Sequence, residues 1–221
     1  MTYRWNFASV FENWQALAMG LAGTLKLSIV CVILGLSLGL IIAFGRRARQ
    51  APIRWVSTAF VEFFRNTPVL IQILWFYFAL PMIAPIEVSP FLAAVLGITL
   101  NAAAYSSEIY RGGIQSIEPG QTEAARAIGM SGLQTLRRIV IPQAVRRILP
   151  ALTNRGIEIV KTSTLASVVA YVELMQQGKL IASLNFNPIE AYTVVGVMFM
   201  LLLYPFVRAT YAIERRLARS D

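Results

Sequence analysis

Long apolar runs recur along the chain, and polar residues gather between them. Each run is at least as long as the roughly 20 residues that carry a helix across a hydrocarbon core of about 30 Å. The runs cover residues 25–45, 56–82, 90–111, 146–172 and 190–212. The pattern predicts an all-α polytopic membrane protein with five transmembrane helices, in which residues 1–221 form a single domain.

Composition supports a membrane protein and argues against a nucleic-acid surface. Hydrophobic residues make up 57% of the chain, charged residues only 14%, and the mean hydropathy is +0.61. An ordinary soluble domain is less apolar than this. The net charge of +9 is not gathered on one polar segment with interleaved aromatic residues, as nucleic-acid binding requires. We therefore expect contact with membrane lipid and no nucleic-acid partner.

The distribution of basic residues predicts the orientation in the membrane. Three clusters lie at residues 46–54, at 111–155 and in the tail from Arg208 to Arg219, whereas Arg4 and Lys179 stand alone on the opposite side. Basic residues concentrate in cytoplasmic loops. The amino terminus is therefore expected outside, and the carboxyl terminus is expected in the cytoplasm.

A polar segment of about residues 115–142 carries signals for two short helices. Pro119 begins the first helix, and Gly129 is suited to the left-handed turn that ends it. Ser131 and Gln134 have the spacing of a capping box at the start of the second helix. Pro142 is expected to interrupt the second helix. The segment is therefore predicted to be a compact cytoplasmic two-helix element.

The same segment resembles the EAA loop of ABC importer membrane subunits. Its residues read Glu-Ala-Ala, three residues, Gly, nine residues, then Ile-x-Ile-Pro, with Ile141 where that family usually carries Leu. In that family the loop inserts into a cleft of a separate ATPase subunit. The resemblance implies that ATPase coupling rests on Glu123, Ala124, Ala125, Gly129, Ile139, Ile141 and Pro142. The alternative is an interfacial loop on the lipid headgroups, which the matched spacing disfavours.

Further segments resemble permeases of the histidine, arginine, glutamine and glutamate-aspartate importer group. They are Arg65-Asn66-Thr67-Pro68, the run from Asn101 to Gly113, and Lys161-Thr-Ser-Thr164. Many relatives read Lys-x-Thr-Ser at the last of these, which leaves the exact serine and threonine contacts open. The resemblance implies a type I ABC importer permease fold in the bacterial inner membrane. It also implies three partners: ABC ATPase subunits, an extracytoplasmic amino-acid-binding protein, and a second copy or a homologous permease.

Polar residues inside the predicted spans are candidates for a substrate path, because unpaired ionisable groups are costly in a bilayer. The candidates are Asn101, Tyr105, Glu108, Glu158, Lys161 and Thr164. An interhelical polar clamp is the structural alternative, and Glu62 and Arg65 have the spacing of a simple ion pair. The sequence leaves open whether the acids and Lys161 touch substrate or pair with each other. Gly35 and Gly39 predict a close helix contact.

The residues also argue against chemistry on this chain. It has no His, a single Cys31 in an apolar run, and no Walker A sequence, since Gly178-Lys179 is followed by Leu. We expect a transport subunit that is not an enzyme and holds no metal or cofactor, with ATP bound by the partner ATPase. The alternatives are an ion-coupled secondary transporter using Glu108, Glu158 and Lys161, or an ABC permease for another small polar solute. The sequence does not name the amino acid, nor choose between a homodimer and a heterodimer.

Overall fold

The computed structural model describes residues 4–217, without the side chain of Arg216, and this part of the chain consists of helices joined by short turns and loops, with no strand. The Arg219 of the carboxyl-terminal basic cluster lies outside the described residues. The expected all-α class is confirmed. The elements are α1 (Ala8–Phe11), α2 (Trp14–Gly45), α3 (Ala51–Asn66), α4 (Val69–Leu74), the π-helical turn η1 (Trp75–Ala79), α5 (Leu80–Ile83), α6 (Pro90–Gln115), α7 (Pro119–Ala127), α8 (Gly132–Thr135), the π-helical turn η2 (Leu136–Val140), α9 (Ile141–Thr162), the 3₁₀ segment η3 (Ser163–Val169), α10 (Leu174–Asn185) and α11 (Pro188–Leu217).

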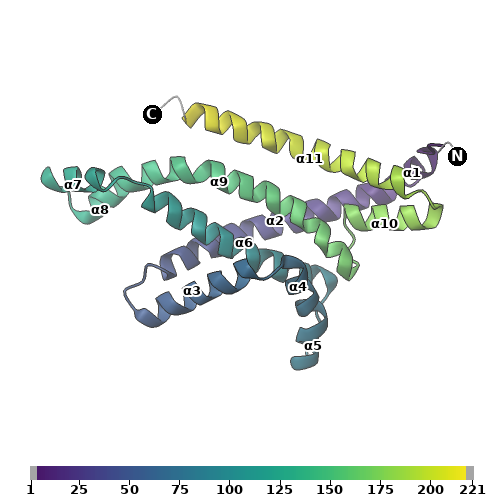
Figure 1. The fold of residues 1–221 in the computed structure, drawn as a ribbon, viewed down its shortest axis with the longest axis horizontal. Coiled ribbons are helices and arrows are strands. Elements are labelled where there is room, and N and C mark those ends of the chain that lie inside the picture. The colour runs from purple at the N-terminus through teal and green to yellow at the C-terminus, as the bar shows by residue number, and fades with distance from the viewer. Residues whose placement is uncertain (1–3, 218–221) are drawn as a thin grey trace.

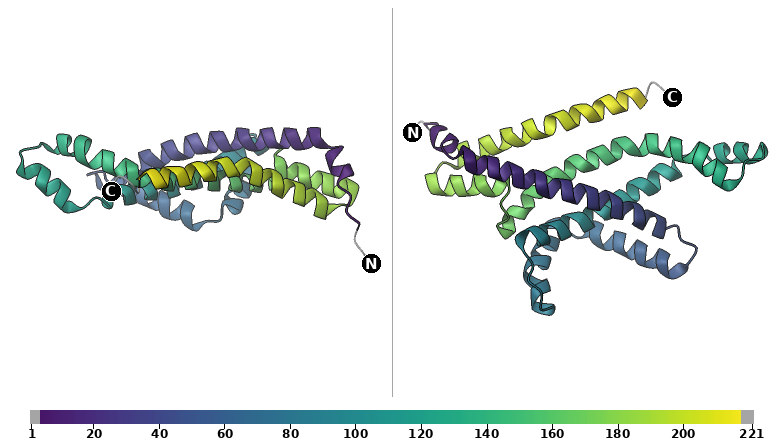
Figure 2. Two further views of the ribbon diagram at one scale, coloured as in Figure 1. Left: turned by 90° about the horizontal axis from the view of Figure 1, so that it is seen from above. Right: turned by 180° about the vertical axis from the view of Figure 1, so that it is seen from behind.

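The molecule is elongated and thin in one direction (Figures 1 and 2). The long helices α2, α6, α9 and α11 run along its length, and the α3 to α5 segment projects to one side. Helices α7 and α8 lie at one end, while α1 and α10 lie at the other (Figure 1). The polar segment and the start of the chain are therefore at opposite ends of the molecule, and the orientation in the membrane remains a prediction.

Three of the described helices are long and apolar enough to cross a membrane: α2, α6 and α11. A fourth candidate is the pair formed by α3 and residues 69–83, which bend by 104° at their junction. The predicted span over 56–82 is therefore broken rather than continuous. Most of the predicted span over 146–172 is covered by α9, which gives way to the 3₁₀ segment η3. The count of five spans remains a prediction.

The break between α3 and α4 has a local cause in Pro68. A residue before proline is pushed out of the helical region, and Thr67 is extended with φ −105° and ψ 131°. The carbonyls that lose their helical partners are satisfied by side chains. Gln72 Nε2 donates to the carbonyls of Phe64 at 3.1 Å and of Thr67 at 2.9 Å, and Thr67 Oγ1 donates to Phe63 O at 2.8 Å. Side-chain donors thus satisfy the carbonyls of Phe63, Phe64 and Thr67 at the bend.

Helices α2 and α6 pack closely along a strip of small residues, as the glycine spacing predicts. A Cβ atom on Gly35 would lie 2.7 Å from Ala102 Cβ, and one on Gly39 would lie 2.7 Å from Ser106 Cβ and 2.8 Å from Ala103 O. Both glycines therefore face α6 of the same chain. Cys31 is fully buried in the adjoining apolar core, which agrees with a packing role.

The strip on α2 continues toward α10, where it meets a buried carboxyl group. Glu173 is fully buried and caps α10, accepting from the N–H groups of Met175 at 2.8 Å and Gln176 at 2.6 Å. Thr24 Oγ1 of α2 accepts from Leu174 N at 3.1 Å. Burial raises the pKa of Glu173 to about 7, against the opposing effect of those N–H groups and of Lys179.

Candidate functional site: a polar pocket and an exposed loop

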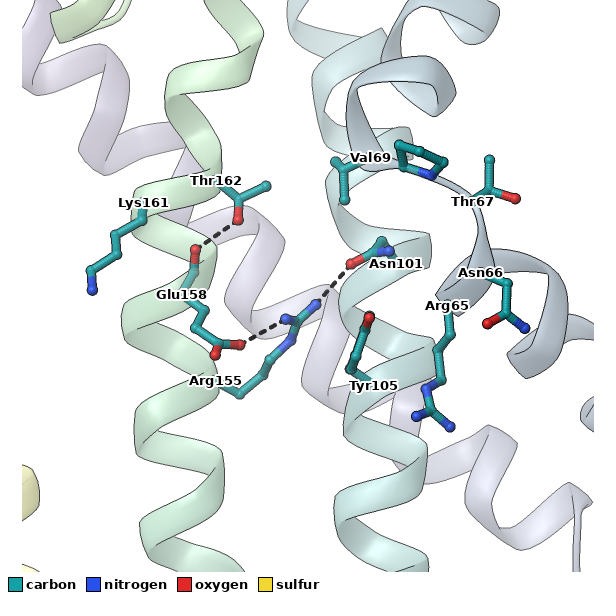
Figure 3. A pocket seen from close by; sticks show the side chains of 11 residues that line it. Arg65, Asn66, Thr67, Val69, Asn101, Tyr105, Arg155, Glu158, Lys161 and Thr162 are labelled. Carbon is teal, nitrogen blue, oxygen red and sulfur yellow. Dashed lines mark hydrogen bonds and ion pairs between the residues drawn. The ribbon is translucent and has the colours of Figure 1, made fainter.

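A polar pocket of about 560 Å³ lies between the α3–α4 turn, α6 and α9. Four of the six predicted path residues line it: Asn101 and Tyr105 from α6, and Glu158 and Lys161 from α9. Figure 3 shows that these side chains come from two neighbouring helices, with the α3–α4 turn closing one side. The remaining lining residues are Arg65, Asn66, Thr67, Pro68, Val69, Arg155 and Thr162.

Arg155 ties α9 to α6 across this pocket. Its Nη1 donates to Glu158 Oε2 at 2.9 Å, and its Nη2 donates to Asn101 Oδ1 at 2.9 Å. The guanidinium also lies over the Tyr105 ring, 4.5 Å from the ring centroid, which is a favourable cation–π arrangement. Asn101 in turn donates from Nδ2 to Phe64 O at 2.8 Å. One arginine and one asparagine thus join three elements of the site.

The sequence pattern does not indicate Arg155 or Arg65 as path residues. Arg155 belongs to the basic cluster over residues 111–155 that predicts the cytoplasmic side, yet the structure places it in the pocket. Its i, i+3 spacing to Glu158 was the available signal. Arg65 lies 5.2 Å from the Tyr105 ring centroid, and its Nη1 lies 3.4 Å from Glu108 Oε1. The expected Glu62–Arg65 pair is replaced by this contact, and Glu62 instead accepts from Asn66 Nδ2 at 3.2 Å.

Glu108 lies outside the pocket lining, in a cluster of three arginines. Its Oε1 accepts from Arg46 Nη1 and also pairs with Arg65, while its Oε2 accepts from Arg111 Nε at 2.9 Å and from Arg111 Nη2. Its side chain is only 18% exposed. Arg46 follows the last residue of α2, so the cluster joins α2, α3 and α6. This is the arrangement of an interhelical clamp.

Thr164 is the other path candidate that the pocket lining does not include. Its Oγ1 donates to Lys161 O at 2.8 Å, a bond local to the start of η3. Within residues 4–217 the Lys161 ammonium has no hydrogen-bond or ion-pair partner, and its side chain is exposed. The Lys161 ammonium is therefore available to a ligand in the pocket.

The polar segment at residues 115–142 forms an exposed loop, which has the two local features that its sequence predicts. Gly129 has φ +82°, which a residue with a Cβ rarely adopts. Ser131 and Gln134 form a complete capping box: Gln134 N donates to Ser131 Oγ at 3.3 Å, and Ser131 N donates to Gln134 Oε1 at 2.9 Å. The sharp turn between α7 and α8 is thus fixed by local interactions alone.

Pro142 does not end the second helix, contrary to expectation. The chain widens into the π-helical turn η2 and continues directly into α9, with Pro142 in the first turn of α9. A wider turn of this kind accommodates a missing N–H without a break. The loop is therefore mechanically continuous with α9, the helix that supplies Arg155 and Glu158 to the pocket.

The seven predicted coupling residues differ in their exposure to solvent. Five are exposed: Glu123, Ala124, Gly129, Ile141 and Pro142. Ile139 is half-buried, and Ala125 is buried at 3% exposure. Ala125 is therefore packed inside the loop, whereas Ala124 lies on its surface. The exposed apolar surface is instead formed by Ile128 and Leu133, which are 79% and 74% exposed. An apolar tip flanked by charged residues is typical of an interaction surface.

Comparison with known proteins places the whole chain in one group. Residues 35–219 match the family model of the binding-protein-dependent transport system inner membrane component. The chain belongs to this family. It is a membrane component of a transport system, so the expectation that it is a transport subunit rather than an enzyme is confirmed.

Relatives of this inner membrane component cover nearly its full length. The arginine transport system permease protein ArtQ of Bacillus subtilis is 32% identical, over 98% of this chain and 99% of that protein. The glutamine transport system permease protein GlnP of Escherichia coli is 35% identical, over 92% and 95%. A crystal structure of an amino acid ABC transporter with histidines contains a chain with 34% identity and a TM-score of 0.92, covering 97% of this chain and all of that one.

Proposed function

We propose that this chain forms the translocation path for a polar amino acid in an ABC importer, with transport driven by a separate ATPase. The observation that carries the proposal is the pocket between α6 and α9. It presents guanidinium, ammonium, carboxylate, amide and phenol groups within one polar space of about 560 Å³. Similarity to permeases named for arginine and glutamine transport supports an amino-acid substrate.

The pocket offers a partner for each charged group of an amino acid. The Glu158 carboxylate is 61% exposed and has room for an ammonium group. Arg155 and Lys161 are available for a carboxylate. Asn101 and Tyr105 supply an amide and a hydroxyl between the charges. Glu108 and Thr164 serve the same path by holding α3, α6 and the end of α9 in position.

The loop at residues 115–142 would receive the work of ATP hydrolysis. Glu123 and Ala124 present a charge and a small residue at its exposed tip, while Gly129 fixes the turn behind them. Ile139, Ile141 and Pro142 connect this tip to α9. Movement of a docked ATPase would therefore pass along a continuous helix to the pocket and switch its access from one side to the other.

The assembly follows from the same proposal. The amino terminus lies outside, and the carboxyl terminus and the coupling loop lie in the cytoplasm, where they meet ABC ATPase subunits that bind the ATP. An extracytoplasmic amino-acid-binding protein delivers substrate to the other side. A second copy of this chain or a homologous permease completes the path, and the protein spans the inner membrane with five helices.

Uptake by the reconstituted importer tests the coupling role. Proteoliposomes containing this chain, its ATPase and its binding protein are loaded with ATP, and accumulation of a labelled amino-acid mixture is measured. Glu123→Arg is expected to reduce ATP-dependent uptake at least tenfold, because it reverses the charge at the docking tip. Recovery of ATPase subunits with the tagged permease shows whether docking or a later step is lost.

Glu118→Arg is the matched control, since it makes the same charge change at an exposed position five residues away. It is expected to retain most of the uptake. Uptake that proceeds without ATP, follows a proton gradient and ignores Glu123→Arg would overturn the proposal in favour of a secondary transporter.

A further inference from the structure

The charged groups around the pocket do not balance. Arg65, Arg155 and Lys161 line it, but Glu158 is the one carboxylate among its lining residues. The nearby Glu108 pairs with Arg65 at 3.4 Å but is shared with Arg46 and Arg111, so its single negative charge does not offset the surplus. Formal charges in the pocket therefore leave a surplus of two positive charges.

Several donor groups of these cations are unused. The Nε atoms of Arg65 and Arg155 are buried and have no hydrogen-bond partner in the described structure. Buried polar groups nearly always have a hydrogen-bond partner, so two buried donors without one in the same pocket require an acceptor. The Lys161 ammonium is likewise unpaired within residues 4–217. All three unused donors are positively charged, which specifies an anionic acceptor.

The two guanidinium groups also have a fixed geometry. Arg155 and Arg65 both lie against Tyr105, at 4.5 and 5.2 Å from its ring centroid. Figure 3 shows them on either side of that ring, with Lys161 at the outer edge of α9. The pocket thus provides two separated sites for carboxylate, one at each guanidinium group, and one site for ammonium at Glu158.

We propose that the amino acid carried through this pocket is dicarboxylic, an α-amino acid with a carboxylate side chain. The inference rests on the proposed function and adds the substrate class. Such a ligand has a net charge of −1 and reduces the surplus of the pocket. A zwitterionic amino acid leaves the surplus unchanged, and a basic amino acid increases it, which is unfavourable where the surroundings screen charge poorly.

The direct test is binding of labelled L-glutamate to the permease–ATPase complex without the binding protein. Leaving that protein out removes its own selectivity. The complex is placed in nanodiscs of phosphatidylcholine, whose headgroups carry no net charge and do not compete as anions. L-Glutamine is the matched ligand, because it has the same shape without the side-chain charge. Glutamate is expected to bind at least tenfold more tightly than glutamine, and L-arginine is expected not to displace it.

Variants then assign the preference to the pocket. Arg65→Gln leaves Glu108 with two arginines, and Lys161→Gln removes no hydrogen bond or ion pair of the described residues, so both are expected to fold normally. Each is expected to weaken glutamate binding about tenfold while changing glutamine binding less than twofold. Arg208→Gln, at an exposed position on α11, is the charge-matched control and is expected to bind like the native protein.

Equal or tighter binding of glutamine, binding of arginine, or an absence of glutamate binding would each overturn the inference. These results do not contradict the proposed function if uptake of the preferred amino acid still depends on ATP and on Glu123. If no amino acid is taken up with ATP, the proposed function itself is contradicted.

Discussion

The two sides of α6 differ in how they are held. Toward α2 the contact is dry and tight, with Gly35 and Gly39 against Ala102 and Ser106. Toward α3 and α9 the same helix presents Asn101, Tyr105 and Glu108, and every one of these contacts an arginine. Close backbone approach fixes the first side, and charge fixes the second.

The side of α6 toward α2 thus provides rigidity, and the side toward α3 and α9 carries the polar pocket. Van der Waals contact between small residues is a main source of helix association in a membrane, and it leaves little freedom to slide. With α6 fixed against α2, its polar side holds charges in place while α9 lies across the pocket. The polar side has a closed end at Glu108, where one carboxylate meets three arginines, and an open end at the pocket, where Glu158 of α9 lies.

The largest effect is expected from widening the dry contact. Gly39→Val places methyl groups where a Cβ alone would already lie 2.8 Å from a backbone oxygen. The variant is expected to lose about 3 kcal/mol of stability through overpacking. Thermal unfolding in detergent measures it. Gly112→Val is the control, because a Cβ on Gly112 meets nothing within 4 Å, and it should stay within about 0.5 kcal/mol of the native protein.

Glu173, at the start of α10, extends the comparison to a buried carboxyl group beside α2. Its pKa is about 7 in the folded protein and about 4.5 when unfolded, so the folded state holds the proton more strongly. The stabilisation is complete below pH 4.5 and is lost as pH rises through 7, by on the order of 3 kcal/mol. The melting temperature of the native protein should therefore fall between pH 5 and 8. Glu173→Gln, which cannot titrate, should lack this part of the slope, and an identical slope would contradict the assignment.

Removing the carboxylate at the closed end should reduce stability by less than Gly39→Val does, but by a measurable amount. Glu108→Gln leaves Arg46, Arg65 and Arg111 facing one another without their carboxylate. Loss of the charged hydrogen bonds is expected to reduce stability by about 2 kcal/mol. The thermal melt of the purified permease is the measurement, and an unchanged melting temperature would show that the cluster does not clamp the helices.

The smallest effect on stability is expected at the open end. Glu158 is 61% exposed and has Arg155 as its ion-pair partner in the described structure. Exposed pairs contribute little, so Glu158→Gln should cost no more than about 0.5 kcal/mol. Substrate binding should fall by at least tenfold in the same variant, because the ammonium site is lost. A large fall in stability with normal binding would reverse the roles of the two ends.

The sequence predicts features that depend on neighbouring residues. The capping box at Ser131, the positive φ of Gly129 and the small-residue strip of α2 all follow from spacings of a few residues. Apolar runs likewise predict the long helices α2, α6 and α11, because run length and hydropathy are properties of one segment. The family resemblance also follows from local motifs, and the family match bears it out.

Only the tertiary structure decides the pocket and its charge. Arg155 and Asn101 are 54 positions apart, and Arg46 and Glu108 are 62 apart. No helical period relates such residues, so their meeting depends on how the helices pack. The sequence by itself therefore determined the long helices α2, α6 and α11, the local turn of the loop at residues 115–142, and the transport class. Packing alone assigned Arg155 and Arg65 to the pocket and Glu108 to the clamp, because Coulomb interactions depend on distance in space and not along the chain.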